Sequence, residues 1–571
     1  MKKKTRKYIF VVGGVISGVG KGVTTSSIGK ILQSHGYRVT AMKIDPYVNV
    51  DAGTMNPTEH GEVFVLKDGD ETDQDMGNYE RFLETSLTRD SYMTTGRVYL
   101  SVIQKERALT YKGKCVQVVP HIPYEVIDRI NHAVDKANAE IVIIEVGGTV
   151  GEYENILFLE TARMLKIKNP DDVLFAIVSY LPTPSKVGEM KTKPTQHAVR
   201  ALNSVGIQPD FIIARSDVAL DEKRKEKIAL FCNVIPESVI SAPDVDSIYD
   251  VPVNFEKDKL GEKILRRLKL KSKGKNEGWK EWERFARKAH SVKDEVRIAV
   301  VGKYFDTGDF ILSDSYLSVI EALKYSAIHQ GKKAKLVWLS SSTFESLPAT
   351  VSSNPSGANR RRQAGKNPPL AGLEEFDGIL VPGGFGSRGI EGNLNVIRFA
   401  REHKIPYFGI CYGMQLAVIE YARNVLGYKD ATSREIDPKS KHLIVDIMEG
   451  QKENLEKGNL GGSMRLGAYE AVLEKGTIAR TAYGVDKIVE RHRHRFEVNP
   501  TYIEELEEKG LVFSGRSPSG TLMEIAELPT SVHPFFLGTQ FHPEFEARPL
   551  HPHPVFSAFI KAVIARGKNT K

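Results

Sequence analysis

Cysteine is scarce in this sequence. Only three cysteines, at positions 115, 232 and 411, occur in 571 residues. Three thiols cannot build the disulfide framework of a small secreted domain, so disulfide-rich extracellular classes are excluded and a reducing cytosol is expected. Long apolar runs are also missing, because no stretch approaches the ~20 apolar residues that cross a bilayer. We therefore expect a cytoplasmic protein with no membrane partner.

A strong charge of one sign is missing as well. The chain has 80 basic and 72 acidic residues, a net charge of +8. This mild excess suits small anionic substrates but gives no reason to expect nucleic acid as a partner. The basic N-terminus followed by Tyr8–Val12 superficially resembles a signal peptide. Four glycines and Lys21 interrupt that run by residue 21, so we expect no signal peptide.

The length and the ordinary composition, 41% hydrophobic and 27% charged, predict two or three globular domains. We expect domains at residues 1–270 and 296–571, a basic linker at 271–295, and a flexible insertion at about 352–369. The second domain begins with the apolar run Val296–Gly302. In the first domain, continuous apolar runs separated by helix-like segments indicate a parallel α/β sheet covered on both faces. These runs are Tyr8–Val12, Arg38–Ile44, Ile141–Val146, Val173–Val178 and Phe211–Ala214.

Cys411 lies where an apolar run meets a helix-compatible segment. The pattern Gly409-x-Cys-x-Gly413 is typical of a nucleophile elbow, and the following helix N-terminus favours a thiolate. Downstream, His542 and Glu544 offer a base and a carboxylate that orients it. Backbone N–H groups near Gly384–Phe385 and Tyr412 could form an oxyanion hole. The alternative is a buried inert thiol, but the elbow glycines and the His-x-Glu pattern favour a catalytic cysteine.

A glycine-rich stretch, Gly13–Gly22, follows a strand and precedes a helix, as a phosphate-binding loop requires. Lys21 would add a positive charge for the phosphates. The spacing is one residue longer than in the common P-loop, and Gly22 replaces the usual Ser or Thr, so a Mg²⁺ ligand must come from elsewhere, with Thr24 and Thr25 as candidates. The alternative is a glycine-rich turn that binds no ligand.

Two carboxylates extend the predicted nucleotide site. Glu145 ends an apolar strand before a double glycine, which is where nucleotide sites open in α/β sheets. Asp75 lies in an acidic segment and is a weaker signal by itself, because acidic loops are usually only solvated.

Several longer strings are more specific than either motif. These strings are Lys43–Met55, His60–Val65, Gly77–Phe82, Lys191–His197 and Arg491–Glu497. Through them the chain resembles the CTP synthase family, glutamine-dependent ligases that aminate UTP, from about residue 7 to about residue 563. This resemblance implies an N-terminal P-loop-like (Rossmann-like) synthetase domain and a C-terminal α/β class I glutamine amidotransferase domain.

The resemblance also implies ligands and assembly. The substrates would be ATP, UTP and L-glutamine, with Mg²⁺ accompanying ATP and with no organic prosthetic group. GTP would activate the enzyme, and CTP would inhibit it by feedback. The implied assembly is a homotetramer built on the N-terminal domain, and family members also form filaments.

Roles at single positions follow from the same resemblance. Catalysis falls on Cys411, His542 and Glu544, and metal binding falls on Asp75 and Glu145. ATP binding falls on Ser17, Gly18, Val19, Gly20, Lys21, Gly22, Lys43, Asp75, Arg215, Asp244 and Val245. UTP and CTP binding falls on Ser17, Glu152, Tyr153, Glu154, Lys191, Thr192, Lys193, Pro194, Thr195, Gln196 and Lys227. Glutamine binding falls on Gly384, Gln415, Glu435 and Arg495, an ammonia gate on His60 and Val63, and a GTP lid on Arg388, Gly389 and Glu391.

Three positions depart from the family pattern. Glu152 replaces an aspartate, Tyr412 replaces the leucine after the nucleophile, and Arg434 replaces a threonine. The longer Glu152 puts the affinity for CTP in doubt.

Two other functions stay open. One is a different amidotransferase-coupled ligase such as the corrinoid amidases, although these lack the Lys-Thr-Lys-Pro-Thr-Gln string of Lys191–Gln196. The other is a non-catalytic scaffold, either a partition-type ATPase or a filament-forming protein.

Overall fold

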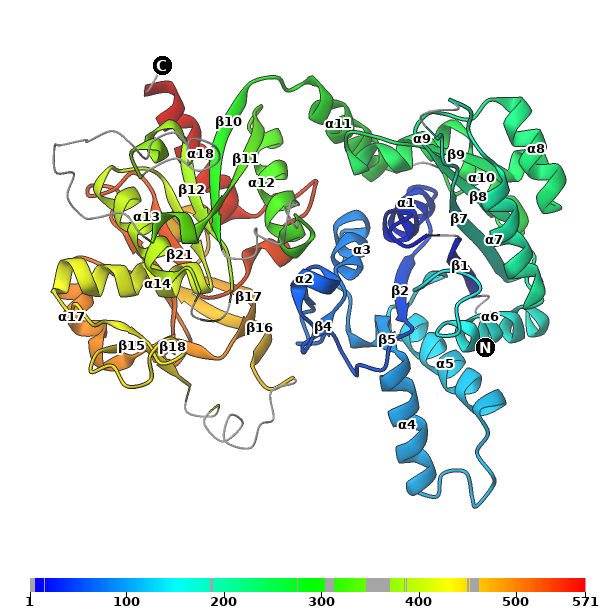
Figure 1. The fold of residues 1–571 in the computed structure, drawn as a ribbon, viewed down its shortest axis with the longest axis horizontal. Helices are drawn as coiled ribbons and strands as arrows, with labels where there is room; N and C mark the ends of the chain where they lie inside the picture. The colour runs from blue at the N-terminus through cyan, green and yellow to red at the C-terminus, as the bar shows by residue number, and fades with distance from the viewer. Residues whose placement is uncertain are drawn as a thin grey trace, which may run out of the picture. The chain divides into compact units, whose positions relative to one another are not determined.

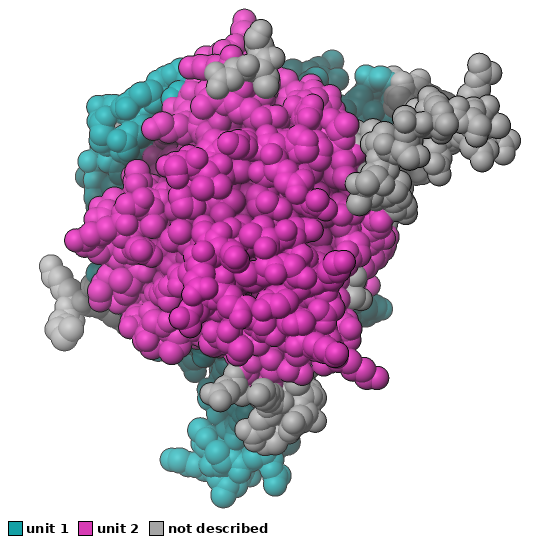
Figure 2. Space-filling view, turned by 90° about the vertical axis from the view of Figure 1, so that its left-hand side faces the viewer, with its two compact units in different colours: residues 1–52, 72–289 teal, residues 53–71, 290–571 magenta. Residues whose placement is uncertain are grey.

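The computed structural model describes residues 6–14, 16–184, 188–274, 276–302, 313–345, 370–384, 386, 388–448, 451 and 462–569. The predicted insertion at 352–369 lies outside these residues. The chain forms two compact units, drawn in separate colours in Figure 2. Unit 1 consists of Met1–Ala52 and Thr72–Ala289, and unit 2 consists of Gly53–Glu71 and His290–Lys571. The chain therefore leaves unit 1 after Ala52, adds residues 53–71 to unit 2, and returns at Thr72. We call residues 53–71 the crossing segment.

Unit 1 is built on a seven-stranded sheet with the order β5-β2-β6-β1-β7-β8-β9. Every strand pair in it is parallel, which confirms the predicted sheet type. All five predicted strands are present in it. The strands are β1 (Lys7–Gly14), β2 (Val39–Asp45), β5 (Tyr92–Thr94), β6 (Ile141–Val146), β7 (Val173–Tyr180), β8 (Phe211–Ser216) and β9 (Val239–Pro243).

Helices cover both faces of this sheet. Since successive side chains of a strand point to opposite faces, each strand contributes to two cores. On β1, Phe10 and Val12 face a core shared with α4–α8, whereas Ile9 and Val11 face a core shared with α1 and α9–α11. The first set is α4 (Thr95–Arg107), α5 (Val118–Lys136), α6 (Ile156–Lys168), α7 (Lys193–Ser204) and α8 (Glu222–Cys232). The second set is α1 (Lys21–Ser34), α9 (Val251–Lys257), α10 (Leu260–Arg267) and α11 (Glu277–Ser291). A further helix, α3 (Asp75–Leu83), packs along α1, and α4 and α5 form a hairpin that extends away from the sheet (Figure 1).

Unit 2 contains a nine-stranded sheet with the order β11-β10-β12-β13-β21-β20-β19-β16-β17. The first five strands are parallel and the remaining pairs are antiparallel. The parallel strands are β10 (Glu295–Gly302), β11 (Lys333–Ser340), β12 (Gly378–Val381), β13 (Tyr407–Ile410) and β21 (Phe536–Thr539). The others are β16 (Arg465–Leu473), β17 (Lys487–His494), β19 (Val512–Arg516) and β20 (Met523–Leu528).

The remaining elements of unit 2 frame this sheet. A small sheet has the order β14-β15-β18, formed by Thr432–Ser433, Leu443–Ile447 and Phe496–Val498. The crossing segment contains a short helix, α2 (Pro57–His60), and a short strand, β3 (Phe64–Val65), whose partner is β4 (Glu71–Thr72). The main helices are α12 (Leu317–His329), α13 (Ile390–Glu402), α14 (Tyr412–Tyr421), α16 (Ile478–Tyr483), α17 (Ile503–Glu508) and α18 (Pro554–Asn569).

Strand order brings the chemistry-bearing loops of unit 2 together. The neighbours β12, β13 and β21 run parallel, with Ile410 paired to Thr539, so their carboxyl ends meet at one edge. Gly384, Cys411 and His542 directly follow these three ends.

Candidate active sites

Cys411 forms a strained turn between β13 and α14. Its backbone has a φ of 49° and a ψ of −97°, a conformation that few side-chain-bearing residues adopt. The flanking glycines are required sterically, because a Cβ on Gly409 would lie 2.6 Å from the Gly413 carbonyl carbon and one on Gly413 would lie 2.2 Å from the Val381 oxygen. The predicted elbow is therefore present, and it holds the thiol at the N-terminus of α14.

His542 and Glu544 complete a Cys-His-Glu arrangement. His542 Nδ1 lies 2.7 Å from Glu544 Oε1. Burial alone would lower the pKa of His542, but the Glu544 carboxylate and the Cys411 thiolate outweigh burial and raise this pKa to about 10. Near neutral pH the His542 ring is therefore an imidazolium, beside the Cys411 side chain.

The triad opens into a pocket of about 590 Å³. Gly383 and Gly384 form one wall, and a Cβ on Gly383 would approach the His542 ring to 2.9 Å. A second wall comes from the crossing segment, although this lies some 350 residues earlier in the chain than Cys411. The lining residues beside the triad and the two glycines are Pro57, Glu62, Val63, Ser315, Tyr316, Arg493 and Phe545.

Of the two predicted gate residues, Val63 lines this pocket, whereas His60 is exposed and does not line it. Gly384 is the predicted glutamine-binding residue that lines it. Gln415 is linked to Cys411 through Gln540. Its side-chain amide donates to Gln540 Oε1 at 3.3 Å, and the Gln540 amide nitrogen lies 3.7 Å from Cys411 Sγ.

Glu435 and Arg495, also predicted for glutamine binding, lie outside the pocket lining. Glu435 Oε1 accepts a hydrogen bond from the Gly386 backbone N–H at 2.7 Å. Arg495 Nη1 donates to Gln451 Oε1 at 3.1 Å. The Gly386 carbonyl in turn accepts a hydrogen bond from the Tyr412 hydroxyl at 2.9 Å, so this loop is held at both backbone groups.

The predicted GTP lid residues lie at the start of α13. Gly389 caps the helix with a φ of 73°, and a Cβ there would lie 2.1 Å from Ser341 Oγ, so only glycine fits. Glu391 accepts hydrogen bonds from Arg423 at 2.9 Å, and Arg388 is exposed.

Sequence reasoning missed Glu62 and Arg493 as parts of the Cys411 pocket and Gln540 as a contact of the Cys411 sulfur. A signal for Arg493 was present, because successive residues on a strand point to opposite faces. In Arg491–Arg495, the first two arginines reach the crossing segment, whereas His492 and His494 are buried in contact with each other. Burial lowers the pKa of both histidines well below the ordinary value, so both are neutral.

The second site lies in unit 1, where β1, β2 and β6 end. The glycine-rich stretch leads into α1 through Gly20, which has a φ of 90°, and Lys21 Nζ donates to the Gly148 carbonyl oxygen at 2.8 Å. A Cβ on Gly13 would lie 2.9 Å from Lys21 Nζ, so this glycine makes room for the lysine. Burial lowers the pKa of Lys21. Ser17 and Gly18 are exposed at the tip of the loop, where a phosphate could approach.

Lys43 at the end of β2 gathers the acidic residues of this site. Its Nζ lies 2.6 Å from Asp75 Oδ2 and 2.7 Å from Glu145 Oε1, the two predicted metal ligands, and within 4 Å of Asp45 and Asp73. Burial opposes the charge of Lys43, but these carboxylates hold its pKa well above the usual value. Burial and the neighbouring Asp75 raise the pKa of Glu145.

This donor set fits Mg²⁺. Hard carboxylate oxygens are its preferred ligands, and it usually takes one or two of them, with waters and phosphates completing the shell. Asp75 Oδ1 lies so close to the backbone of Gly22 that a Cβ there would meet it at 1.9 Å, which explains why glycine replaces Ser or Thr after Lys21. Among the described residues, no group of three or more His, Cys, Asp or Glu side chains is arranged to hold a metal ion by itself. Of the candidate threonines, Thr25 is fully buried in α1.

Next to the loop, a cavity of about 340 Å³ is lined by Gly20, Arg215 and Val245, all predicted for ATP. Thr24, Pro243 and Phe255 supply further wall, which gives the cavity an apolar side suited to an adenine ring. Asp244 does not line it but pairs with Arg215 at 2.6 Å.

The residues predicted for UTP lie in two segments. At the start of α7, Thr195 and Gln196 are buried and bonded to Ser179 and Thr192, whereas Lys193 and the more distant Lys227 are exposed. Lys191 pairs with Glu189 at 2.6 Å.

In the loop after β6, Glu152 folds back onto Thr149, accepting from its N–H at 2.9 Å and its hydroxyl at 2.6 Å. Tyr153 is 90% exposed and Glu154 is exposed. Glu152, one of the departures from the family pattern, therefore stabilises the loop that contains it.

None of the described helices combines the length and the apolar character that crossing a membrane requires.

Comparison with known proteins places both units. Residues 7–270 match the model of the CTP synthase N-terminus, and residues 311–562 match that of class I glutamine amidotransferases. A CTP synthase of Pyrococcus furiosus is 49% identical over 97% of this chain and 97% of its own length. One of Pyrococcus abyssi is 50% identical over the same shares. A solved glutaminase domain of the Trypanosoma brucei CTPS, with bound acivicin, is 36% identical and covers 47% of this chain and 94% of its own, with a TM-score of 0.40, too low to bear on the fold. From the identity to full-length relatives along nearly its whole length, the chain belongs to the CTP synthase family.

Proposed function

We propose that this protein makes CTP by aminating UTP at C4, with ATP consumed and with ammonia supplied by hydrolysis of glutamine. The observation that carries the proposal is that one chain holds both a buried Cys411–His542–Glu544 triad and a Lys43-centred acidic cluster beside a glycine-rich loop. The first arrangement releases ammonia from an amide, and the second suits phosphoryl transfer.

In the glutaminase step, the Cys411 thiolate attacks the carboxamide carbon of glutamine. His542 donates a proton to the departing ammonia and then takes one from water that hydrolyses the thioester, while Glu544 keeps the imidazole oriented and charged. The backbone N–H of Tyr412 and those after Gly383 would stabilise the oxyanion. Phe385, predicted for this hole, lies outside the described residues. Gln415, Glu435 and Arg495 would hold the substrate directly or through Gln540 and Gly386.

In the ligase step, the γ-phosphoryl group of ATP moves to O4 of UTP, and ammonia then displaces phosphate. Lys21 and Lys43 would stabilise negative charge on the group in transfer, and the cavity beside Arg215 and Val245 would hold the adenine. Phosphorylation is needed because oxide is a poor leaving group. Lys191–Gln196 and Lys227 would bind the triphosphate of UTP.

Asp75 and Glu145 would hold Mg²⁺ when the nucleotide binds. Bound there, the ion would neutralise charge on the phosphates. In the present structure Lys43 contacts both of these carboxylates.

Regulation, assembly and location are part of the same proposal. GTP would act through the lid at Arg388, Gly389 and Glu391, and CTP would compete through the loop at Glu152–Glu154. The ligase would occupy residues 1–270 and the amidotransferase residues 296–571, in a homotetramer. A cytoplasmic location is supported by the need to keep the Cys411 thiol reduced.

One assay tests the proposal. The purified protein is incubated with UTP, ATP and Mg²⁺, with either glutamine or ammonium chloride, with and without GTP, and CTP is quantified by chromatography. We expect CTP from both nitrogen donors, with GTP raising the rate from glutamine. No CTP from either nitrogen donor would overturn the proposal.

A further inference from the structure

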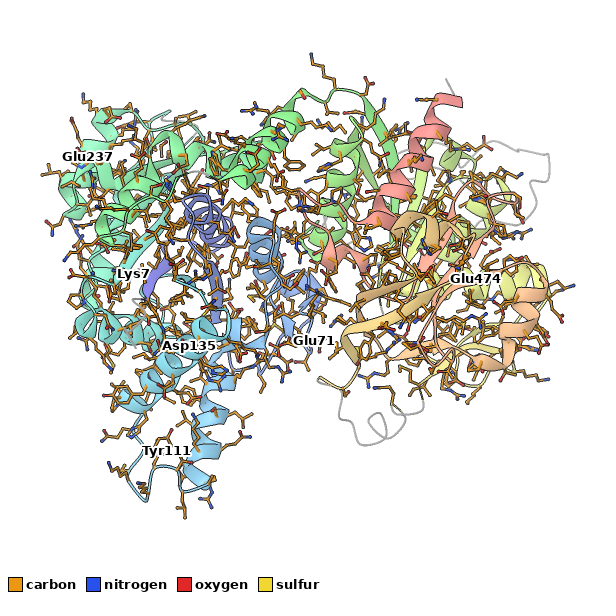
Figure 3. All side chains as sticks on the ribbon, turned by 180° about the vertical axis from the view of Figure 1, so that it is seen from behind. Lys7, Glu71, Tyr111, Asp135, Glu237 and Glu474 are labelled. Carbon is orange, nitrogen blue, oxygen red and sulfur yellow. The ribbon has the colours of Figure 1, made fainter. Side chains whose placement is uncertain are left out.

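Glu71, the last residue of the crossing segment, packs against Gly53, its first residue. A Cβ on Gly53 would lie 2.1 Å from Glu71 Oε2, so the carboxylate packs directly against the backbone where the segment begins. Glu71, labelled in Figure 3, has a side chain only 2% exposed, and its Oε1 accepts a hydrogen bond from Arg493 Nε at 2.8 Å. A buried ion pair of this kind constrains geometry strongly, because breaking one partner leaves the other charge buried.

A second anchor lies in the middle of the segment. The Glu62 carboxylate accepts hydrogen bonds from the backbone N–H of Ser318, at 3.1 and 3.2 Å, and from the Ser318 hydroxyl. Ser318 is in the first turn of α12, where a carboxylate is favoured by unsatisfied N–H groups and the helix dipole. Nearby, Ser315 Oγ donates to the Pro57 carbonyl oxygen at 3.0 Å.

Between these anchors, the segment packs against β17 and the triad loop. The Val65 carbonyl oxygen accepts a hydrogen bond from Arg491 at 3.0 Å. The fully buried Phe64 ring lies 5.0 Å from that of Phe545, which in turn stacks on His542 at 5.2 Å. The segment thus reaches the triad through an aromatic contact.

Arg493 provides a second route to the nucleophile. Its guanidinium donates to Glu71 at the end of the crossing segment, while its carbonyl oxygen lies 3.9 Å from Cys411 Sγ. Arg493 therefore contacts both the reacting sulfur and the crossing segment. A displacement of Glu71 would displace this wall of the pocket.

The two ends of the crossing segment continue directly into unit 1, whose residues 43–45 and 73–75 carry the acidic cluster. Building on the function proposed above, we propose that Glu71 and Arg493 are positioning residues: their ion pair holds the crossing segment as a wall of the Cys411 pocket, and so sets how much of the ammonia released there is used for amination. When the segment loosens, ammonia escapes to solvent and becomes ammonium, which is not nucleophilic.

The variant Glu71→Gln tests this, because it keeps the size of the side chain and removes its charge. With glutamine as donor, glutamate and CTP are both quantified, and CTP formation from ammonium chloride is measured separately. The wild type should give close to one CTP per glutamate. For Glu71→Gln we expect continued glutamate release and ammonia-dependent CTP formation, with CTP per glutamate lower by about fivefold. A ratio equal to that of the wild type overturns the proposal.

The matched control is Glu470→Gln. It removes a Glu–Lys pair from the same β16–β17 ribbon, where Glu470 meets Lys487 at 2.8 Å on the surface, and should leave the ratio unchanged. An equal drop in this control would show that the effect is not specific to the crossing segment, and would also overturn the proposal.

A second variant covers the case in which Glu71→Gln does not fold. Glu62→Gln weakens the other anchor and should lower the same ratio, with faster amide hydrogen exchange at Leu66 and Ala468, whose N–H groups donate to the carbonyl oxygens of Asp70 and Lys67. Unchanged exchange and an unchanged ratio would contradict the inference. If the wild type makes no CTP from ammonia, the proposed function fails; if it does and both variants keep the ratio, only this inference fails.

Discussion

The Cys411 pocket and the Lys43 cluster differ in what completes them. At the pocket, protein groups alone set the protonation state, because Glu544 and Cys411 together raise the pKa of His542 to about 10. At the cluster, two predicted metal ligands lie against a lysine ammonium at 2.6 and 2.7 Å. The pocket is therefore preorganised for the proposed hydrolysis of glutamine, whereas the carboxylates of the cluster are paired with an internal cation.

The largest expected effect separates the two sites. Cys411→Ala removes the nucleophile, so glutamine-dependent CTP formation should fall by at least ~1,000-fold. Ammonia-dependent CTP formation should remain, because the cluster in unit 1 is untouched. The two donors are compared in parallel CTP assays, and glutamine use equal to that of the wild type would remove Cys411 from the mechanism.

Lys43→Met should produce the reverse pattern. Without the ammonium, stabilisation of the group in transfer is lost, and CTP formation from either donor should fall by roughly 100-fold or more. Glutamate release should continue. The buried Asp75 and Glu145 lose their partner, so the free energy of unfolding should fall by about 3 kcal/mol in chemical denaturation. The exposed Lys280, paired with Glu277, offers the control Lys280→Met.

Glu544→Gln tests the preorganisation through pH. In the wild type the imidazolium persists up to a pH near 10, so the His542 ring should not titrate between about pH 6 and 9 when its chemical shift is followed by NMR. Without the Glu544 charge, burial dominates and lowers the pKa of His542, so the ring of the variant should be neutral near pH 7. Alkylation of Cys411 by iodoacetamide at pH 7 should then be about 10-fold slower than in the wild type, because the sulfur has lost its cationic neighbour. A His542 ring that stays charged up to pH 9 in the variant would show that Glu544 does not hold the charge.

Tyr412→Phe should give the smallest effect. It removes one hydrogen bond, from the Tyr412 hydroxyl to the Gly386 carbonyl oxygen, while Glu435 still holds the Gly386 N–H. The loss of about 1 kcal/mol corresponds to a roughly fivefold higher KM for glutamine. Since the hydroxyl belongs to unit 2 and the acidic cluster to unit 1, the rate with ammonia should stay unchanged. A large fall in kcat without a change in KM would point to a role in the chemical step instead.

Local patterns in the sequence predicted most of the framework. Apolar runs such as Tyr8–Val12 became buried parallel strands, and the glycines around Cys411 predicted the elbow because only glycine leaves room for Val381. Hydrophobic continuity and steric limits act over a few residues, so they can be read directly from the chain.

What could not be predicted depends on packing between distant segments. The crossing segment lies in the N-terminal half of the sequence, yet Phe64 packs on Phe545 and Glu71 pairs with Arg493. The contact of Lys43 with Asp75 and Glu145 joins the ends of separate elements in the same way. No periodicity or spacing within one segment encodes such contacts, because they follow from strand order.

The crossing segment also means that the molecule is not modular in the way its linear order suggests. A glutaminase fragment cut at residue 290 would begin at a natural unit boundary and still lack Pro57, Glu62 and Val63 from its pocket wall. It would also expose the Phe545 ring and the fully buried Arg491 side chain to water. An amidotransferase unit moved to another protein would therefore need residues 53–71 supplied to it as an additional segment.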